Sequence, residues 1–243
     1  MKTTASGNNL FQLTQIAVMN CYLVRENDGF TLIDTTISGQ AQSIIQAAQK
    51  LGLPIARIVL THAHVDHVGS LDALHEALPD IPVAISERDA RFLSGDRSLD
   101  PSEPQVPLHG SYPVCKTKPT VLLHDGDRIG SLEVIATPGH TPGHMAFLDT
   151  RDRSIIAGDA FQTQGGVAVA GTLKLLFPLP ALATWYKPLC LESARKLLAL
   201  QPSLLSVGHG AMLSNPQAAM ERAIRVMEQA LAKGERQVSH GGA

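Results

Sequence analysis

The sequence predicts a single α/β domain, covering residues 1–243, in which mixed β-sheets are flanked by helices. Its length of 243 residues and its 44% hydrophobic content allow a substantial buried core. Strand-like and helix-like patterns alternate along the chain without an internal repeat. Both halves show this alternation, which favours sheets with helices packed on their outer faces.

The first half predicts a β-hairpin followed by alternating helices and strands. The apolar runs QIAVMNCYLV and FTLIDTT flank the turn ENDG and predict two strands. The segment SGQAQSIIQAAQKLG predicts a helix with Ser38 as its N-cap and Gly52 at its end. RIVL and VAIS predict further strands, and SLDALHEAL and ERDARFL predict helices.

A polar excursion with five prolines occupies residues 94–119. Loops of this length inside a compact domain are usually functional or disordered, so we expect a lid here. The second half then predicts strands at TVLL, LEVIAT, HMAFLDT, SIIAGD and LLSVG. Helices are expected over residues 189–200 and 216–233, followed by a short tail at about 234–243.

Composition excludes several kinds of partner. The formal net charge is −2, and lysines and arginines are scattered, so we expect neither nucleic acid nor a membrane surface as partner. The nearly uncharged stretch 166–185 contains Lys174, Pro178 and Pro180, which argue against a spanning helix. The first residues lack a secretory pattern, and the three cysteines are far apart, so a cytoplasmic location is expected.

The most informative motif is THAHVDH, which directly follows an apolar run. In an extended segment His62, His64 and Asp66 project to the same side, and His67 turns with the start of the next helix. Imidazole and carboxylate suit a borderline divalent ion such as zinc. Four such donors exceed what one tetrahedral site takes from a single segment, so two adjacent metal ions are indicated.

Three more segments place candidate ligands after apolar strands. They are IATPGHTPGH with His140 and His144, SIIAGDA with Asp159, and LLSVGHG with His209. A glycine before each ligand lets the backbone turn sharply near a crowded centre. Taken singly, Asp159 also suits a helix cap and His209 a buried hydrogen-bonded histidine.

Together these motifs resemble those of the metallo-β-lactamase superfamily of hydrolases. The similarity runs in order from NCYLV and FTLIDTT through THAHVDH, TPGHTPGH and AGDA to VGHG, and so covers almost the whole chain. The resemblance implies a four-layer αβ/βα sandwich of two mixed sheets flanked by helices, with the metals at one edge between the sheets.

The resemblance also implies a ligand for each position. The first metal would bind His62, His64 and His140. The second would bind Asp66, His67 and His209. Asp159 would bridge both ions, and His144 would support the site without binding metal. The two divalent ions would be zinc, with iron or manganese as alternatives.

The chemistry implied by such a site is hydrolysis. Water between two divalent cations loses a proton near neutral pH and provides the nucleophile. Asp66 would orient it and pass a proton to the leaving group. Esters, thioesters, lactones and amides are all compatible substrates. Glyoxalase II has a longer helical C-terminal extension than this chain, and acyl-homoserine lactonases usually carry a tyrosine where this chain has Phe161 and Gln162.

An apolar segment over residues 161–187 follows the bridging aspartate. It offers Phe161, Phe177, Trp185 and Tyr186 as binding residues for the apolar part of a small carbonyl substrate. The same aromatic residues are equally compatible with core packing or with the interface of a homodimer.

A different reaction class has a related ligand set. Persulfide dioxygenases resemble this chain in length and bind one iron, for which His64, His140 and Asp159 would be the ligands here. A complete set of seven ligands is more than one iron requires, so hydrolysis is the preferred interpretation.

Overall fold

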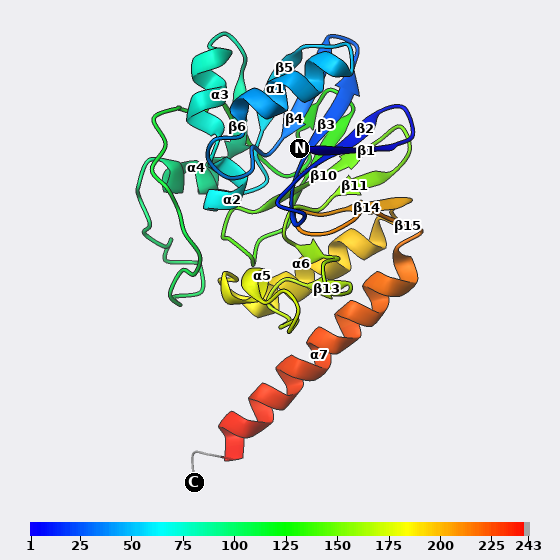
Figure 1. The fold of residues 1–243 in the computed structure, drawn as a ribbon. Helices are drawn as coiled ribbons and strands as arrows, with labels where there is room; N and C mark the ends of the chain where they lie inside the picture. The colour runs from blue at the N-terminus through cyan, green and yellow to red at the C-terminus, as the bar shows by residue number, and fades with distance from the viewer. Residues whose placement is uncertain (241–243) are drawn as a thin grey trace.

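The computed structural model describes residues 1–240 and consists of two mixed sheets with helices on their outer faces (Figure 1). The first sheet has seven strands in the order β1-β2-β3-β4-β5-β6-β7. Their bounds are β1 Lys2–Ser6, β2 Leu10–Gln15, β3 Met19–Glu26, β4 Gly29–Ile33, β5 Ile55–Val59, β6 Val83–Ser86 and β7 Val121–Leu123. Strands β1 to β4 pair antiparallel, and β4 to β7 pair parallel.

The second sheet has six strands in the order β15-β14-β11-β10-β9-β8. Their bounds are β8 Arg128–Ile129, β9 Leu132–Ala136, β10 Met145–Asp149, β11 Ser154–Ile156, β14 Leu204–Ser206 and β15 Leu213–Ser214. A separate pair is formed by β12 (Phe161–Gln162) and β13 (Ala168–Val169). The predicted class of two mixed sheets with flanking helices is confirmed.

The helices fall into two groups. In the first half they are α1 Ala41–Lys50, α2 Val65–Val68, α3 Leu71–Ala77 and α4 Glu87–Leu93; in the second half, α5 Leu179–Leu182, α6 Lys187–Ala199 and α7 Gln217–His240. Figure 1 shows α1 and α3 on the side of the first sheet and α6 and α7 on the opposite side of the molecule. Among the described residues, no helix is both long and apolar enough to cross a membrane.

Alternating side chains within the strands build a core of three layers. In β3, Leu23 packs under the helices of the first half, whereas Tyr22 faces the space between the sheets. In β10, Phe147 faces that same inner space, whereas Leu148 packs toward α6 and α7. Because successive residues of a strand point to opposite faces, one short apolar strand contributes to two layers.

Several element boundaries differ from the prediction. The strand expected from Gln15 is broken, because Ile16 and Ala17 have positive φ values of 49° and 61° and form the turn between β2 and β3. Ser38 is not the N-cap of α1; Gln40 is, and its N–H donates to Ser70 Oγ at 2.9 Å. A tertiary contact therefore sets this helix start.

The chain ends also depart from expectation. Strands β1 and β2 were not predicted from the polar start of the sequence, because β1 is exposed and has no apolar alternation to show. Helix α7 continues to His240, so most of the tail predicted at residues 234–243 is helical. Residues 241–243 lie outside the described part of the chain.

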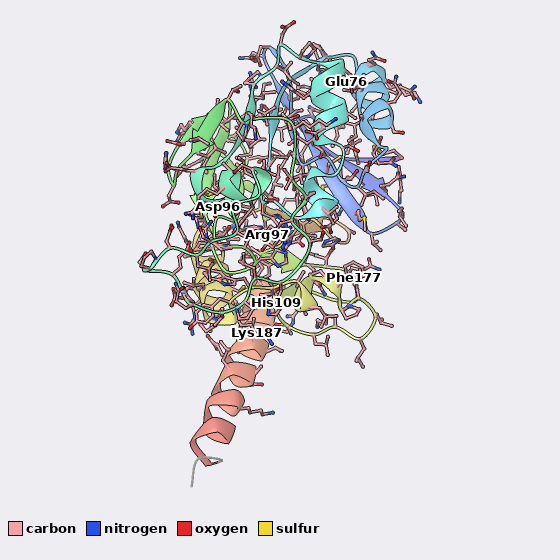
Figure 2. All side chains as sticks on the ribbon, turned by 90° about the vertical axis from the view of Figure 1, so that its left-hand side faces the viewer. Glu76, Asp96, Arg97, His109, Phe177 and Lys187 are labelled. Atoms are coloured by element: carbon pink, nitrogen blue, oxygen red, sulfur yellow. The ribbon has the colours of Figure 1, made fainter. Side chains whose placement is uncertain are left out.

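Residues 94–119, here called the strap, contain no helix or strand, as predicted. The strap is nevertheless fixed at both ends. Arg88 and Arg91 of α4 pair with Glu103 at 2.7 Å and Asp100 at 2.6 Å. Near its other end, the Cys115 N–H donates to the Leu93 carbonyl oxygen at 2.9 Å. Figure 2, which looks onto this side, places Arg97 and His109 on the strap.

Candidate metal centre

Four loops bring the predicted ligands together at one edge of the sandwich. His62 and His64 follow β5 of the first sheet, and His140 lies between β9 and β10 of the second. Asp159 follows β11 and His209 follows β14. Because β11 and β14 are neighbouring parallel strands, the last two residues leave the sheet side by side.

The helix after the first motif begins earlier than predicted. Helix α2 starts at Val65, so Asp66 does not extend along the strand direction with His62 and His64. The side chain of Asp66 joins His67 and His209 instead. The short helix therefore divides the motif between two groups of ligand atoms.

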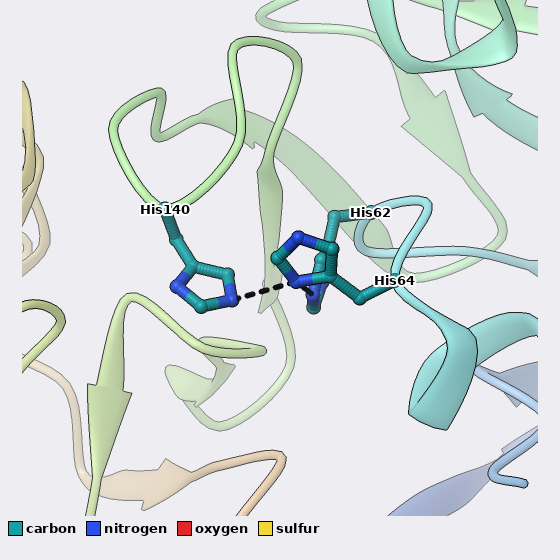
Figure 3. Close-up of side chains that lie close together, drawn as sticks. All are labelled: His62, His64 and His140. Carbon is teal, nitrogen blue, oxygen red and sulfur yellow. Dashed lines mark hydrogen bonds between the residues drawn. The ribbon is translucent and has the colours of Figure 1, made fainter. Parts of the chain in front are cut away.

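The first cluster consists of His62, His64 and His140. Nδ1 of His64 lies 3.1 Å from Nε2 of His62 and 3.0 Å from Nε2 of His140. Figure 3 shows the three rings turned toward one another. All three side chains are buried, with at most 3% exposed.

The outer hydrogen bonds of two rings show which nitrogens carry protons. His64 Nε2 faces the His109 carbonyl oxygen at 3.1 Å and must donate to it, so His64 Nδ1 holds a lone pair. Thr184 Oγ1 donates to the Pro180 carbonyl oxygen at 2.7 Å and so accepts from His140 Nδ1 at 3.1 Å. His140 Nε2 therefore also holds a lone pair, 3.0 Å from that of His64.

The third ring follows the same logic. Thr61 Oγ1 donates to Asp34 Oδ2 at 2.8 Å, so it accepts from His62 Nδ1 at 2.9 Å. His62 Nε2 is then also a bare acceptor. Three lone pairs directed at one point repel unless a cation lies between them. The outer contacts thus orient each ring for metal binding.

The second cluster contains two carboxylates and two imidazoles. His209 Nε2 lies 3.2 Å from Asp66 Oδ2 and 3.1 Å from Asp159 Oδ2. His67 Nε2 lies 3.4 Å from Asp159 Oδ1. The Asp159 carboxylate thus reaches both histidines, and its Oδ2 is also 3.4 Å from Nε2 of His140 in the first cluster. Asp159 occupies the position that a bridging ligand requires.

The rings of the second cluster are also held from outside. His67 Nδ1 bonds to Asp34 Oδ2 at 2.8 Å, and His209 Nδ1 bonds to the Val18 carbonyl oxygen at 3.0 Å. Among residues 1–240, the buried atoms His67 Nε2 and Asp159 Oδ1 have no hydrogen-bond partner. Buried polar atoms without partners are rare, and a metal ion would satisfy both.

The two clusters differ in their electrostatics. Burial lowers the pKa of His64 to about 4, and it likewise lowers the pKa of His62 and His140. Burial also opposes protonation of His209, but Asp159 and Asp66 outweigh it and raise the pKa to about 10. The first cluster is therefore neutral at pH 7, whereas the second holds protons that a metal ion would replace.

This donor set fits two divalent ions. The first cluster offers three neutral imidazole nitrogens, and the second offers imidazole nitrogens with carboxylate oxygens. Such mixed nitrogen and oxygen ligands suit zinc, iron and manganese. The ligand atoms of His62, His64 and His140 lie within 4.8 Å of one another, as do those of Asp66, His67 and His209, and Asp159 forms a further such group with His62 and His67.

His144 lies beside the clusters but has no free ring nitrogen. Its Nε2 accepts a hydrogen bond from the Asp159 N–H at 3.0 Å. Its Nδ1 bonds to Thr137 Oγ1 at 2.8 Å. His144 therefore orients the backbone of Asp159, whereas His140 presents Nε2 to the cluster.

Sequence reasoning missed the residues that support the ligands. Asp34 accepts hydrogen bonds from Thr61 and His67, although it lies far from both in sequence. The sequence signal was FTLIDTT, where a charged residue directly follows a mostly apolar strand. In the structure Asp34 is buried and adopts a positive φ of 62°. A charged residue in such a buried, strained position commonly serves a site.

A cavity of about 410 Å³ opens onto both clusters. Its polar side is formed by ligand atoms of His64, Asp66, His140, Asp159 and His209. Its apolar wall comes from Met19, Ile37, Val65, Leu179, Pro180, Leu182 and Ala183. No lysine or arginine of the described chain lines it. The cavity therefore combines a metal-binding floor with an uncharged wall.

The four aromatic residues predicted to bind substrate do not line this cavity. Phe161 is fully buried in the core under α6 and α7. Trp185 is buried and stacks near Tyr186, with ring centroids 6.0 Å apart. Phe177 packs against the His209 ring at 5.1 Å. Residues 179–183 of the same segment, which include helix α5, line the cavity instead.

Comparisons with known proteins agree with this geometry. The profile of the metallo-beta-lactamase superfamily matches residues 18–209. The Bacillus subtilis protein YobT is 53% identical over 85% of this chain and 89% of its own. The Bacillus subtilis "Probable metallo-hydrolase YflN" is 30% identical over 80% of this chain and 81% of its own. The solved structure of TTHA1623 in a di-iron-bound form has a TM-score of 0.59 and 30% identity, covering 85% of this chain and 94% of that one.

Proposed function

The chain belongs to the metallo-beta-lactamase superfamily and is a metallo-hydrolase, and we propose on this premise that it hydrolyses small ester, thioester or lactone substrates at two metal ions. The observation that carries the proposal is the pair of ligand clusters joined by Asp159, which approaches His140, His67 and His209 at 3.1–3.4 Å. Two divalent ions bound there would activate water near neutral pH and polarise a carbonyl group.

The residues of the chain have separate tasks in this reaction. Asp66 lines the cavity, and 24% of its side chain is exposed, so it can take a proton from water and deliver it to the leaving group. The surrounding histidines hold the pKa of Asp66 well below its usual range even though burial raises it. Asp66 is thus ionised, as a proton acceptor must be.

The cavity wall supports a substrate whose non-reacting part is apolar and uncharged. Leu179 and Leu182 line it and remain 56% and 64% exposed, so apolar surface continues to the mouth. Residues 160–191 contain no aspartate or glutamate. An acyl chain would cover part of this surface, whereas a charged group would find no ionic partner on the wall.

Zinc is the proposed metal, with iron or manganese as alternatives. The imidazole-rich first cluster favours zinc, and the relative TTHA1623 has been solved in a di-iron-bound form, which supports iron as the alternative. The free cysteines Cys21, Cys115 and Cys190 are buried, which supports a reducing compartment, and we place the protein in the cytoplasm.

The proposal is tested by combining metal analysis with a substrate panel. Purified protein should contain two metal ions per chain and should hydrolyse members of a matched series of esters, thioesters and lactones, with loss of activity on chelation and recovery on metal return. Asp66→Asn should weaken metal binding at the second cluster and lose most of the turnover, even when excess metal restores two ions per chain. One iron per chain, with oxygen consumed on a persulfide substrate, would instead establish the dioxygenase alternative.

A further inference from the structure

We propose that Asp89 is a positioning residue that fixes the two loops of the first cluster relative to each other, so that His64 and His140 converge on one metal ion. The inference rests on the proposed function, because it concerns the same site. Asp89 lies in the first turn of α4 and is fully buried. It is absent from the lining of the cavity, and so would act through other residues.

The carboxylate of Asp89 bridges both ligand loops. Its Oδ2 accepts from the Ala63 N–H at 3.0 Å, and Ala63 stands between His62 and His64 in the chain. The same oxygen accepts from Thr141 Oγ1 at 2.7 Å. Its Oδ1 accepts from the Gly143 N–H at 2.7 Å. One side chain therefore holds three donors from two loops.

The bridge joins the two halves of the fold. The loop of Ala63 follows β5 in the first sheet, whereas Thr141 and Gly143 lie between β9 and β10 in the second. Because His64 and His140 belong to different sheets, no backbone hydrogen bonding within a sheet fixes the distance between them. A shift of one sheet relative to the other would therefore separate the two rings. A buried carboxylate bonded to both loops opposes that shift.

The site around Asp89 leaves little room for adjustment. A Cβ atom at Gly143 would lie 2.6 Å from Asp89 Oδ1 and 2.5 Å from Ser86 Oγ, so only glycine allows this approach. Ser86 Oγ accepts from the Asp89 N–H at 3.0 Å and fixes the start of α4. This cap acts on the backbone of the helix and is separate from the three hydrogen bonds that the carboxylate accepts.

Helix α4 also supports the contact at Nε2 of the His64 ring, through the strap. Its residues Arg88 and Arg91 pair with the strap, and the carbonyl oxygen of His109 on the strap accepts from His64 Nε2 at 3.1 Å. Asp89 thus positions the His64 loop, while its neighbours on α4 support the residue that orients the His64 ring. This makes α4 the common support of the first cluster.

The test is Asp89→Asn, which keeps the shape of the side chain. An amide has one acceptor oxygen, so whichever way it turns, its NH₂ group faces a backbone N–H of Ala63 or Gly143. We expect Asp89→Asn to weaken Co²⁺ binding at one position about 10- to 100-fold, as outer contacts of metal ligands do, with the other position unchanged. Co²⁺ titration followed by absorption spectroscopy measures both affinities.

The affected position is identified by comparison with His140→Ala, which removes a ligand of the first cluster. Ser86→Ala is the matched control, because it removes the cap of α4 and leaves the carboxylate bridge. It should lower the melting temperature without changing either Co²⁺ affinity. If Asp89→Asn does not fold, Thr141→Val and Thr141→Ser replace it: only the valine variant loses a donor to Asp89, and only it should weaken first-cluster binding.

The outcomes separate this inference from the proposed function. Wild-type protein that binds fewer than two ions contradicts the dinuclear proposal. If wild-type protein binds two ions, and Asp89→Asn and Thr141→Val both bind Co²⁺ with wild-type affinity at each position, the positioning role is overturned. The role is also overturned if both positions weaken equally in Asp89→Asn, because a general loss of structure would do that. Selective loss at the first cluster, with the second unchanged, supports it.

Discussion

The indole Nε1 of Trp185 donates a hydrogen bond to the carbonyl oxygen of Val106 at 3.2 Å, which joins the segment after Asp159 to the strap. Trp185 is buried, and through this hydrogen bond it anchors the strap rather than contacting substrate. It links the strap to the short connection between α5 and α6.

Trp185→Phe should therefore loosen the strap without unfolding the protein. The loss of one partly buried hydrogen bond costs about 1 kcal/mol of unfolding free energy. Tryptic cleavage after Arg97, on the strap, should become several-fold faster than in wild type. Urea unfolding and limited proteolysis measure the two effects. Tyr186→Phe, which leaves the Val106 contact in place, is the control, and equal cleavage rates in both variants would contradict the assignment.

His140 and His144 should differ in metal content. His140→Ala removes a nitrogen of the first cluster and should leave about one ion per chain with most activity lost. His144→Ala removes the acceptor of the Asp159 N–H, and should keep two ions with affinity or turnover lowered about 10- to 100-fold. Elemental analysis of the dialysed variants checks this. If His144→Ala lost an ion and His140→Ala kept both, His144 would be the metal ligand and His140 the supporting residue.

Metal binding should depend on pH differently at the two clusters. The carboxylates of Asp159 and Asp66 outweigh burial and raise the pKa of His209 to about 10, so this ring is protonated at pH 7 before metal binds; the pKa of His67 is shifted in the same direction. The pKa of His64 is lowered to about 4, so its ring is already neutral. Affinity at the second cluster should rise about tenfold per pH unit for each proton released, up to about pH 10.

The first cluster should show little change in affinity between pH 6 and pH 8. Calorimetric titrations of Zn²⁺ in buffers with different ionisation enthalpies give the number of protons released by each ion. A value near zero for the first ion and of at least one for the second is expected. Equal proton release at both positions would contradict the electrostatic difference between the clusters.

Leu182→Gln should lower the preference for long acyl chains. Leu182 lines the cavity, and partial burial of one leucine by substrate contributes about 1 kcal/mol, or about fivefold in kcat/KM. Hydrolysis of an octanoyl ester should fall by that factor relative to the acetyl ester. Leu175→Gln, at a position 91% exposed and outside the cavity lining, should leave the ratio unchanged. Identical ratios in the two variants would remove α5 from the substrate site.

Local patterns in the sequence were sufficient for much of the fold. Helix α4 coincides with the predicted segment ERDARFL, and β6 coincides with VAIS, because capping and apolar alternation are local signals. The start of α1 was misplaced, since Gln40 is held by Ser70 from elsewhere in the chain. Contacts of this kind leave no periodic trace in the sequence.

The candidate site shows the same division. The histidines and aspartates after strands were visible as motifs, and the structure brings them together. For the aromatic residues the sequence left substrate binding and core packing equally open, because composition does not show which side of a segment faces the metal ligands; the structure places Phe161 in the core. The supports of the ligands were also missed, since the Asp34 contact with His67 and the Asp89 contact with Gly143 each join residues distant in sequence.

The order of the ligands along the chain means that the two clusters are completed at different stages of translation. His62, His64 and His140 have all left the ribosome before β14 is made, because β14 begins at Leu204. Strand β11, which precedes Asp159, has β14 as its parallel partner, and His209 arrives only with that partner. A nascent chain that stops before β14 carries every ligand of one position and lacks a ligand of the other. The ligands of the second cluster are therefore completed last, and only a chain translated as far as His209 carries both clusters.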